Sequence, residues 1–256
     1  MRPDSDSDRG LYLINTEGKT DPVQLEPAPG DNSNPIMPTA RNTIIYLNAG
    51  KLRVMASDAS GDRKLFDQEP AGCDDVTHAS WNLADPDIMV ISCRTDADRD
   101  SMLVVGVDGH LIRRLDAGKD FIGDLALSPD GQTIAFWATD DKDASGGPLY
   151  TLPVIGTGDP KELADTEDGL NSFPAWSPDG SEIAFTRQVS HDNTDIFVMN
   201  LNGSDVRQVT DSEAADNRPS WSPDGKNLLI VSNRKSIDGG PGKTFGFALI
   251  RIATLK

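Results

Sequence analysis

The sequence is dominated by a repeated turn, Ser-Pro-Asp-Gly, that separates two apolar runs. Two copies, in residues 176–180 and 221–225, read Trp-Ser-Pro-Asp-Gly, and a third, in residues 127–131, begins with leucine instead of tryptophan. Proline presets φ, aspartate can bond its own backbone and glycine tolerates positive φ, so the motif predicts a tight turn. The β-branched and aromatic residues that follow are typical of strands. Each copy therefore predicts a β-hairpin.

The spacing of these hairpins narrows the choice of fold. Leu127, Trp176 and Trp221 lie 49 and 45 residues apart, and weaker copies upstream begin at Met37 and Trp81. Strand-rich repeats of about 40–50 residues indicate the blades of a β-propeller. Such a blade buries its two faces only by stacking on its neighbours. The sequence thus predicts an all-β fold of four-stranded antiparallel blades that needs no helix.

The repeat also resembles a known family. The order Pro-x-Trp-Ser-Pro-Asp-Gly, an apolar strand, Asp-Ile-Phe-Val-Met-Asn, Asn-Gly-Ser and Arg-Gln-Val-Thr is similar to the TolB-type (WD-like) β-propeller repeat. Residues 171–211 match a whole blade of that type, and residues 217–234 match half of one. The resemblance specifies the blade and says less about function, because propellers of this kind serve many roles.

The number of blades depends on how the two ends of the chain are used. We expect residues 1–9 to form a disordered tether and residues 10–256 to form one propeller domain. Five anchors favour five blades, the last of which ends with Phe245–Ile252 and lacks a fourth strand. A strand at Val23 could supply it, so that N- and C-terminal strands close the ring. Leu11–Asn15 would then compete for the position of the third strand. The alternative is six blades, the usual number in the family that the repeat resembles; the sixth blade would be incomplete, or the chain would be a fragment.

Composition restricts the partners. The formal net charge of −17 argues against nucleic acid, which requires clustered Lys and Arg, and against an anionic membrane surface. No run of about 20 apolar residues is present, so we expect no membrane insertion by this chain. Residues 1–8 are polar, unlike a signal peptide. We expect an acidic monomer that binds a protein or peptide ligand.

The two cysteines, Cys73 and Cys93, fall near a predicted hairpin of Val76–Trp81 with Ile88–Cys93. Cys93 would lie opposite about residue 76, close to Cys73, which leaves open both a disulfide and two buried free thiols. The TolB-type resemblance implies an oxidising, extracytoplasmic setting, such as the periplasm or the outer domain of an anchored protein. That setting favours the disulfide.

Candidate binding residues lie in the loops opposite the Ser-Pro-Asp-Gly turns. In a propeller, the loops after second strands and between blades share one face, and loops on a rigid scaffold commonly carry binding. These loops are acidic, with a few basic or amide side chains among the acids. We expect little specific chemistry on the turn face. The predicted partner-binding residues are Arg94, Arg187, His191, Asp192, Asn217 and Arg218.

Metal and catalytic motifs are sparse. Asp96-x-Asp98-x-Asp100 resembles the start of a calcium loop, but Ser101 and Val107 stand where an EF-hand needs Gly and Glu, so only a different oxygen cage would bind calcium. We predict no cofactor and no other metal. Neither His-Glu-x-x-His nor Gly-x-Ser-x-Gly occurs. His78 and His191 are the residues that an enzymatic alternative would use.

The leading functional prediction is a non-catalytic, protein-binding or sensor β-propeller that presents a long-loop acidic face at the channel mouth. One alternative is a propeller-type hydrolase or lyase that uses channel residues. Another is an accessory propeller of a larger peptidase or receptor. The sequence of whatever precedes and follows the chain in its natural protein would distinguish this last alternative from the first prediction.

Overall fold

The computed structural model describes residues 11–13, 23–25, 32–36, 42–81, 85–95, 99–155, 158–164, 167, 169–233 and 246–251. Within these residues all helical or sheet secondary structure consists of β-strands, as the sequence predicts. The strand pairings of the described sheets are antiparallel. The expected tether, residues 1–9, lies outside them. The chain divides into two units, residues 1–114 and 115–256, and each is described by itself.

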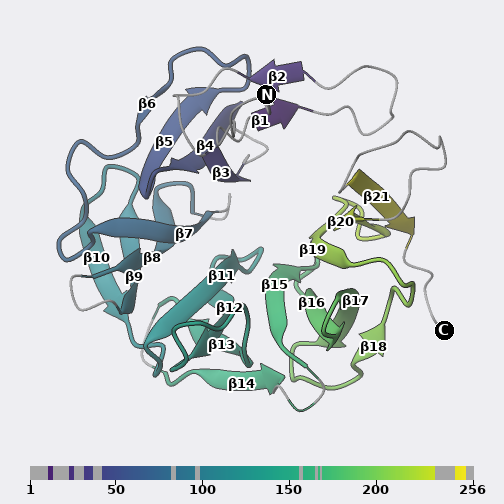
Figure 1. The fold of residues 1–256 in the computed structure, drawn as a ribbon. Coiled ribbons are helices and arrows are strands. Elements are labelled where there is room, and N and C mark those ends of the chain that lie inside the picture. Colours follow the sequence, from purple (N-terminus) through teal and green to yellow (C-terminus); the bar gives the residue numbers. More distant parts are fainter. Residues whose placement is uncertain are drawn as a thin grey trace, which may run out of the picture. The chain divides into compact units, whose positions relative to one another are not determined.

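The first unit contains one two-stranded and two four-stranded sheets (Figure 1). The strands of the three sheets, in chain order, are β1 (Leu11–Leu13) and β2 (Val23–Leu25); β3 (Asn32–Ile36), β4 (Thr43–Asn48), β5 (Lys51–Ala56) and β6 (Arg63–Lys64); and β7 (Asp75–Trp81), β8 (Ile88–Arg94), β9 (Asp100–Gly106) and β10 (Leu111–Leu115).

The second unit contains two four-stranded sheets and one of three described strands. Its strands are β11 (Phe121–Leu127), β12 (Thr133–Thr139), β13 (Leu149–Pro153) and β14 (Lys161–Ala164); β15 (Asn171–Trp176), β16 (Glu182–Ser190), β17 (Asn193–Asn200) and β18 (Arg207–Gln208); and β19 (Asp216–Trp221), β20 (Asn227–Ser232) and β21 (Gly246–Arg251). In this unit the first strands of successive sheets, β11, β15 and β19, pack side by side (Figure 1).

The second strands of the four complete sheets are largely buried. In β12 the five residues Ile134–Ala138 are all buried, and β8 shows the same burial from Met89 to Cys93. A strand covered on both faces loses the alternation of apolar and polar residues that marks a half-exposed strand. The fourth strands are short and more polar, as in β18. This gradient from apolar to polar explains why stacked sheets bury the middle strands and leave the outer edge in water.

The Ser-Pro-Asp-Gly turns form as predicted. In the copy after β11, the Ser128 hydroxyl donates to Asp130 Oδ1 at 2.6 Å, and the same carboxylate oxygen accepts from the Gln132 backbone N–H at 3.0 Å. Gly131 has φ +73°, a conformation that glycine adopts without strain. The copies at Asp179 and Asp224 repeat both hydrogen bonds.

Two of the repeated tryptophans join neighbouring sheets. The Trp176 indole N–H donates to the carbonyl oxygen of Ala126 in β11, at 2.8 Å. The Trp221 indole N–H donates to that of Ala175 in β15, at 3.0 Å. Each of these hydrogen bonds joins the first strand of one sheet to the first strand of the preceding sheet. The tryptophan therefore recurs in the repeat because it connects stacked sheets.

The N-terminal strands differ from the expected closure. Val23–Leu25 pairs with Leu11–Leu13 in a sheet of its own, and is not a fourth strand of the sheet β19–β21. The reason lies in burial: Leu11 and Leu25 pack against Ile44, Tyr46 and Met55 of the first unit. The two strands therefore complete a local core, and the predicted joining of the termini through Val23 is corrected.

Candidate functional site

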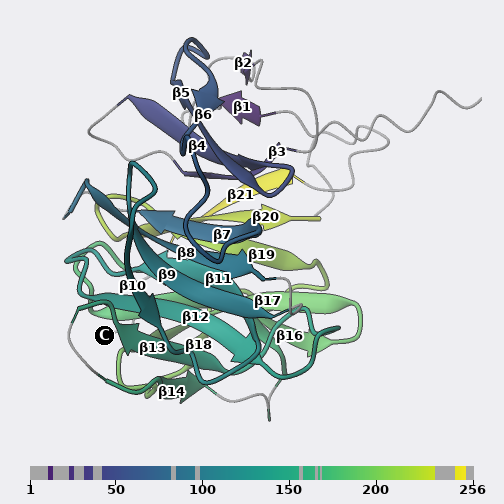
Figure 2. The ribbon, with the colours of Figure 1, turned by 90° about the vertical axis from the view of Figure 1, so that its left-hand side faces the viewer.

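The sheets of the second unit have two distinct ends. The antiparallel register places the start of a first strand beside the end of the second, as in the pairs Asn171–Arg187 and Asp216–Ser232. The loop from second to third strand leaves from this end, which we call the loop end. The Ser-Pro-Asp-Gly turns lie at the opposite end, the turn end. Figure 2 shows the β16–β17 hairpin projecting at the loop end.

Each first strand of the second unit carries a β-bulge near the loop end. The register shifts between Gly123 and Ala126 in β11, and at the corresponding places in β15 and β19. A residue with positive φ sits in every bulge: Asp124 at 49°, Phe173 at 50° and Arg218 at 54°. We call these three residues the bulge row. Positive φ is uncommon for such residues, and bulges re-aim side chains beside functional sites.

The first two members of the bulge row are connected directly. Asp124 Oδ2 accepts the indole N–H of Trp137 at 2.7 Å and the backbone N–H of Phe173 at 3.2 Å. Gly123 makes room for the indole, because a Cβ atom there would lie 2.2 Å from the Trp137 ring. The Asp124 carboxylate therefore holds one sheet against the next.

The third member, Arg218, presents its charge differently. Its guanidinium carbon lies 4.1 Å from the centroid of the Phe173 ring, and its backbone N–H donates to Thr186 Oγ1 at 3.1 Å. The residue is exposed, and it makes no ion pair with any residue that the structure describes. Stacking on an aromatic face orients a guanidinium without satisfying its donors. Arg218 is thus an oriented cation that can bind an acceptor.

Arg187, which the sequence placed on a long loop, lies in the interior. Its side chain is buried, its Nε donates to Asn171 Oδ1 at 2.8 Å, and its guanidinium carbon lies 5.3 and 5.1 Å from the ring centroids of Phe185 and Phe197. The reason is that β16 continues to Ser190 and β17 begins at Asn193, so the expected loop is a two-residue tip. The exposed role expected for Arg187 is corrected.

A buried carboxylate lies on the same hairpin. Asp195 pairs across the strands with Arg187, and accepts hydrogen bonds from Thr210 Oγ1 at 3.0 Å and Gln208 Nε2 at 2.9 Å. Burial raises the pKa of Asp195, these two hydrogen bonds oppose the rise, and the nearby charge of Asp216 adds to it. The hydrogen bonds of the buried Asp195 carboxylate are thus made inside the protein. We therefore assign Asp195 to the packing of the hairpin and not to ligand binding.

The other residues predicted for the second unit lie at its loop end. His191 and Asp192 form the tip of the β16–β17 hairpin, with side chains 97% and 94% exposed and Nε2 to Oδ1 at 3.9 Å. Asn217 is half-buried in β19, directly before Arg218. The structure therefore brings Asn217 and Arg218 together on one bulged strand, and places the His191–Asp192 pair on a separate hairpin.

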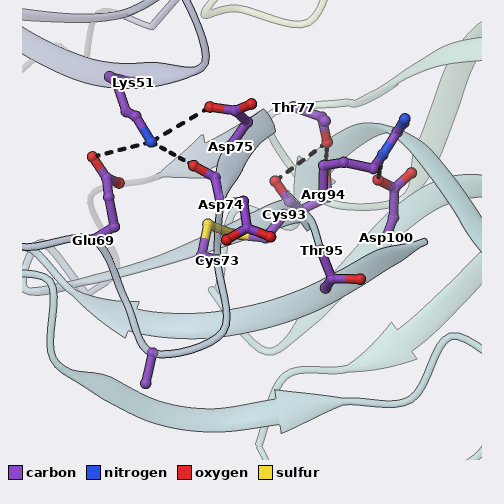
Figure 3. Close-up of a disulfide and its surroundings, with 12 residues drawn as sticks. Lys51, Glu69, Cys73, Asp74, Asp75, Thr77, Cys93, Arg94, Thr95 and Asp100 are labelled. Atoms are coloured by element: carbon purple, nitrogen blue, oxygen red, sulfur yellow. Dashed lines mark hydrogen bonds and ion pairs between the residues drawn. A yellow bond between two sulfur atoms is a disulfide. The ribbon is translucent and has the colours of Figure 1, made fainter. Parts of the chain in front are cut away.

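Arg94 belongs to the first unit. Its Nε donates to the buried carboxylate of Asp100 at 2.8 Å, beside the disulfide shown in Figure 3. Asp96 and Asp98, the other acids of the calcium-like pattern, lie outside the described residues. His78 is half-buried in β7, with Nδ1 3.4 Å from Ser92 Oγ.

The disulfide joins Cys73 to Cys93 with a Cα–Cα separation of 5.1 Å, which is the pairing that the sequence favours. Next to it, Lys51 lies between the carboxylates of Glu69 and Asp75 and donates to the carbonyl of Asp74 (Figure 3). The segment before β7 is therefore fixed to β8 covalently and to β5 by charge.

Sequence reasoning missed Asp124 and Phe173. Both stand three positions before a repeat anchor, as Arg218 does, so the repeat itself was the available signal. Positive φ is not expected for phenylalanine or arginine. The residue types at these positions therefore did not indicate the bulges. The bulge row is visible only once the strands are paired.

No helix within the described residues is long and apolar enough to cross a membrane. No three His, Cys, Asp or Glu side chains of the described part come together in a way that could hold a metal ion.

The chain was compared with known proteins. The family model described as the TolB beta propeller domain matches residues 88–241, more than half of the chain. A relative from Alcanivorax borkumensis, the Tol-Pal system protein TolB, is 31% identical over 93 residues, which are 36% of this chain and 20% of the relative. The chain thus matches about a fifth of that relative's length.

Two solved structures show the same fold. A putative TolB from Agrobacterium tumefaciens superposes with a TM-score of 0.70 at 19% identity, covering 83% of this chain and 73% of that one. TolB from Acinetobacter baumannii superposes with a TM-score of 0.69 at 17% identity, covering 96% of this chain and 61% of that one. Taken with the match of the family model, these similarities show that the chain belongs to the TolB β-propeller domain family.

Proposed function

We propose that this protein is a non-catalytic β-propeller module that binds a protein or peptide ligand at the loop end of its second unit. One observation carries the proposal: Arg218 is exposed on a bulged first strand with its guanidinium over the Phe173 ring. A bulge with positive φ and an aromatic platform together hold the cation in one orientation before a ligand arrives. Ordering a side chain in advance lowers the entropy cost of binding.

The binding residues that we propose are fewer than the sequence suggested. Arg218 is the anchor, because arginine at the centre of an interface often contributes most of the affinity. Asn217 lies beside it, and His191 and Asp192 are exposed at the same end of the sheets. Arg94, the last residue of β8, stays a separate candidate in the first unit. Arg187 is excluded, because its side chain is buried.

Family and covalent structure support a location outside the cytoplasm. The Alcanivorax borkumensis relative is named for the Tol-Pal system, so that protein works in an assembly, and we extend a role in protein binding to this chain. A disulfide between Cys73 and Cys93 is at home in an oxidising compartment. The module would then be periplasmic, secreted or part of an anchored protein, and could act as a sensor domain.

The number of blades is part of the same proposal. The five anchors of the repeat favour five blades. The separate sheet of β1 and β2 supports the alternative of six, in which these two strands are the outer half of an incomplete blade. In either arrangement the bulged first strands would line the central channel, where propellers bind ligands.

The proposal can be tested with peptides selected from a random display library against the full chain. For peptides that bind, Arg218→Ala should weaken the affinity about 5- to 30-fold, the effect of about 1–2 kcal/mol that an interface anchor contributes. Phe173→Leu should weaken it less, since the charge stays but loses its platform. Arg63→Ala removes another exposed arginine, in β6, and should change nothing.

Each variant must also show the wild-type melting temperature, so that lost binding is not lost folding. Selected peptides that bind Arg218→Ala and wild type equally well would refute the anchor. Turnover of a peptide or sugar substrate that depends on His191 would instead support the enzymatic alternative.

A further inference from the structure

The turn end of the second unit contains a hollow that was not expected from the sequence. It has a volume of about 360 Å³ and lies between the Ser-Pro-Asp-Gly turn after β15 and the one after β19. This volume falls within the range of small-ligand sites, roughly 300–1,000 Å³. The hollow lies at the opposite end of the strands from Arg218, and is therefore a separate site from the one proposed above.

Three rigid apolar side chains line the hollow: Pro178, Pro223 and Trp221. Each proline belongs to a turn that is closed by a backbone hydrogen bond from Gly to Ser. Trp221 is held in place because its indole N–H donates to the carbonyl oxygen of Ala175 at 3.0 Å. These walls are thus fixed by the fold, and they could receive an aliphatic stem or a cation that stacks on an aromatic ring.

Three carboxylates, of Asp179, Asp224 and Glu182, also line the hollow. Each turn aspartate accepts hydrogen bonds from a serine hydroxyl and from backbone N–H. These hydrogen bonds lower the pKa of Asp179 and of Asp224, so both carboxylates are ionised at neutral pH. Glu182 pairs with Arg207 Nη2 at 2.6 Å. Lys226 also acts electrostatically on Asp224, so two cations, Arg207 and Lys226, stand against three carboxylates and the hollow keeps a net negative charge.

We propose that this hollow binds the arginine side chain of a basic peptide, with the guanidinium among the carboxylates and the stem against the prolines and Trp221. A planar guanidinium suits the site better than a compact ammonium, since it can bond two carboxylates at once and stack on an aromatic ring. The partner is thus a basic polypeptide segment, which the acidic surface of the protein would also attract.

The preceding junction between turns provides a matched control. Asp130 makes the same hydrogen bonds to serine and backbone as Asp179 and Asp224 do, and its pKa is lowered for the same reason. It does not line the hollow, and Thr133 stands where Glu182 stands one repeat later. Asp130→Asn therefore tests the cost of altering such a turn without touching the proposed site.

The experiment uses the full chain labelled with ¹⁵N and two probes: N-acetyl-Gly-Arg-Gly-amide, and the same peptide with citrulline, a neutral isostere, in place of arginine. The arginine peptide should shift the indole N–H signal of Trp221 saturably and leave that of Trp176 in place. Asp179→Asn and Asp224→Asn should each weaken binding about fivefold, as expected for loss of one charge pair. Asp130→Asn should change it by less than about twofold.

Three results would overturn the proposal: no saturable shift of the Trp221 indole, equal binding of the citrulline peptide, or an equal loss of affinity in Asp130→Asn. Equal melting temperatures of the three asparagine variants, each a little below that of wild type, would show that they keep their turns, because the amide oxygen can accept the same hydrogen bonds. Arg218→Ala should bind the arginine peptide like wild type, so failure of the loop-end proposal would not mimic failure of this one.

Discussion

At the scale of single residues, burial decides which charged side chains can act on a partner. Arg187 and Arg218 belong to adjacent sheets and both contact phenylalanine rings, yet one is buried and the other exposed. The buried guanidinium contributes to stability, and the exposed one is available to a ligand. Two arginines that look equivalent in the sequence thus lie in different environments.

We therefore expect Arg187→Ala to destabilise the protein by about 2–4 kcal/mol. The variant removes a buried donor to Asn171, loses two cation–π contacts and leaves space in the interior. Urea unfolding followed by circular dichroism would measure this, with Arg218→Ala as the control that should cost less than about 1 kcal/mol. Equal stability of Arg187→Ala and wild type would contradict the interior role.

Asp195 leads to a prediction about pH. Its folded-state pKa is raised, so the folded protein binds this proton more tightly than the unfolded chain does, and Asp195 costs stability at neutral pH. The stability of Asp195→Asn relative to wild type should therefore rise as the pH increases from about 4, the ordinary aspartate pKa, to 7. Denaturation midpoints across this range measure the trend.

Asp179→Asn should show the opposite trend, since hydrogen bonds lower the pKa of Asp179 and the wild type gains stability as that carboxyl ionises. Parallel pH profiles for the two variants would show that the environments assigned to these carboxylates are wrong.

At the scale of strands and turns, the sequence predicted what local chemistry controls. The turns at Asp130, Asp179 and Asp224 form the expected hydrogen bonds. It did not predict the length of β16, because Gln188 and Ser190 are polar and the segment resembles a loop. Pairing with Asn193 and Thr194 extends the strand regardless of its polarity. The bulges are likewise a product of pairing, and no residue type signals them.

The disulfide fixes the start of β7 to β8, and it should form in the mature protein. Cys73 and Cys93 are both buried, and the closed segment spans 20 residues. Mass spectrometry of proteolysed, unreduced protein should find the peptides that contain Cys73 and Cys93 linked. After reduction the two peptides should appear separately. Replacing both cysteines with alanine should cost about 3 kcal/mol, the usual value for a loop of this length. Two free thiols after purification in air would contradict the bridge and the oxidising compartment.

At the scale of the whole molecule, the repeat predicted the class of fold, since a unit of about 45 residues with one strand order has few ways to bury itself. It could not predict where β1 and β2 would pack. Short apolar segments at a chain end pair wherever a partly covered core accepts them, and here Leu11 and Leu25 cover Ile44 and Met55. The repeat predicts only the features that all the blades have in common. The strands β1 and β2 lie outside the repeat, so their packing could not be predicted from it.

Net charge also acts on the whole molecule. Forty-one acidic and 24 basic residues give a formal charge of −17 at pH 7, and folding brings these charges closer together than they are in the unfolded chain. Self-repulsion of this kind destabilises the folded state and is screened by salt, because the Debye length falls from roughly 30 Å at 0.01 M to about 3 Å at 1 M. Raising sodium chloride from low to high concentration at pH 7 should therefore raise the melting temperature.

The same titration near pH 4.4, the isoelectric point of the sequence, should have a much smaller effect, since the net charge there is close to zero. The difference between the two pH values isolates charge repulsion from general effects of salt on the hydrophobic core, which operate at both. If salt raised the melting temperature equally at both pH values, local pairs such as Arg53–Asp62 and Arg207–Glu182 would balance the repulsion. If salt lowered the melting temperature at pH 7, such pairs would outweigh the repulsion.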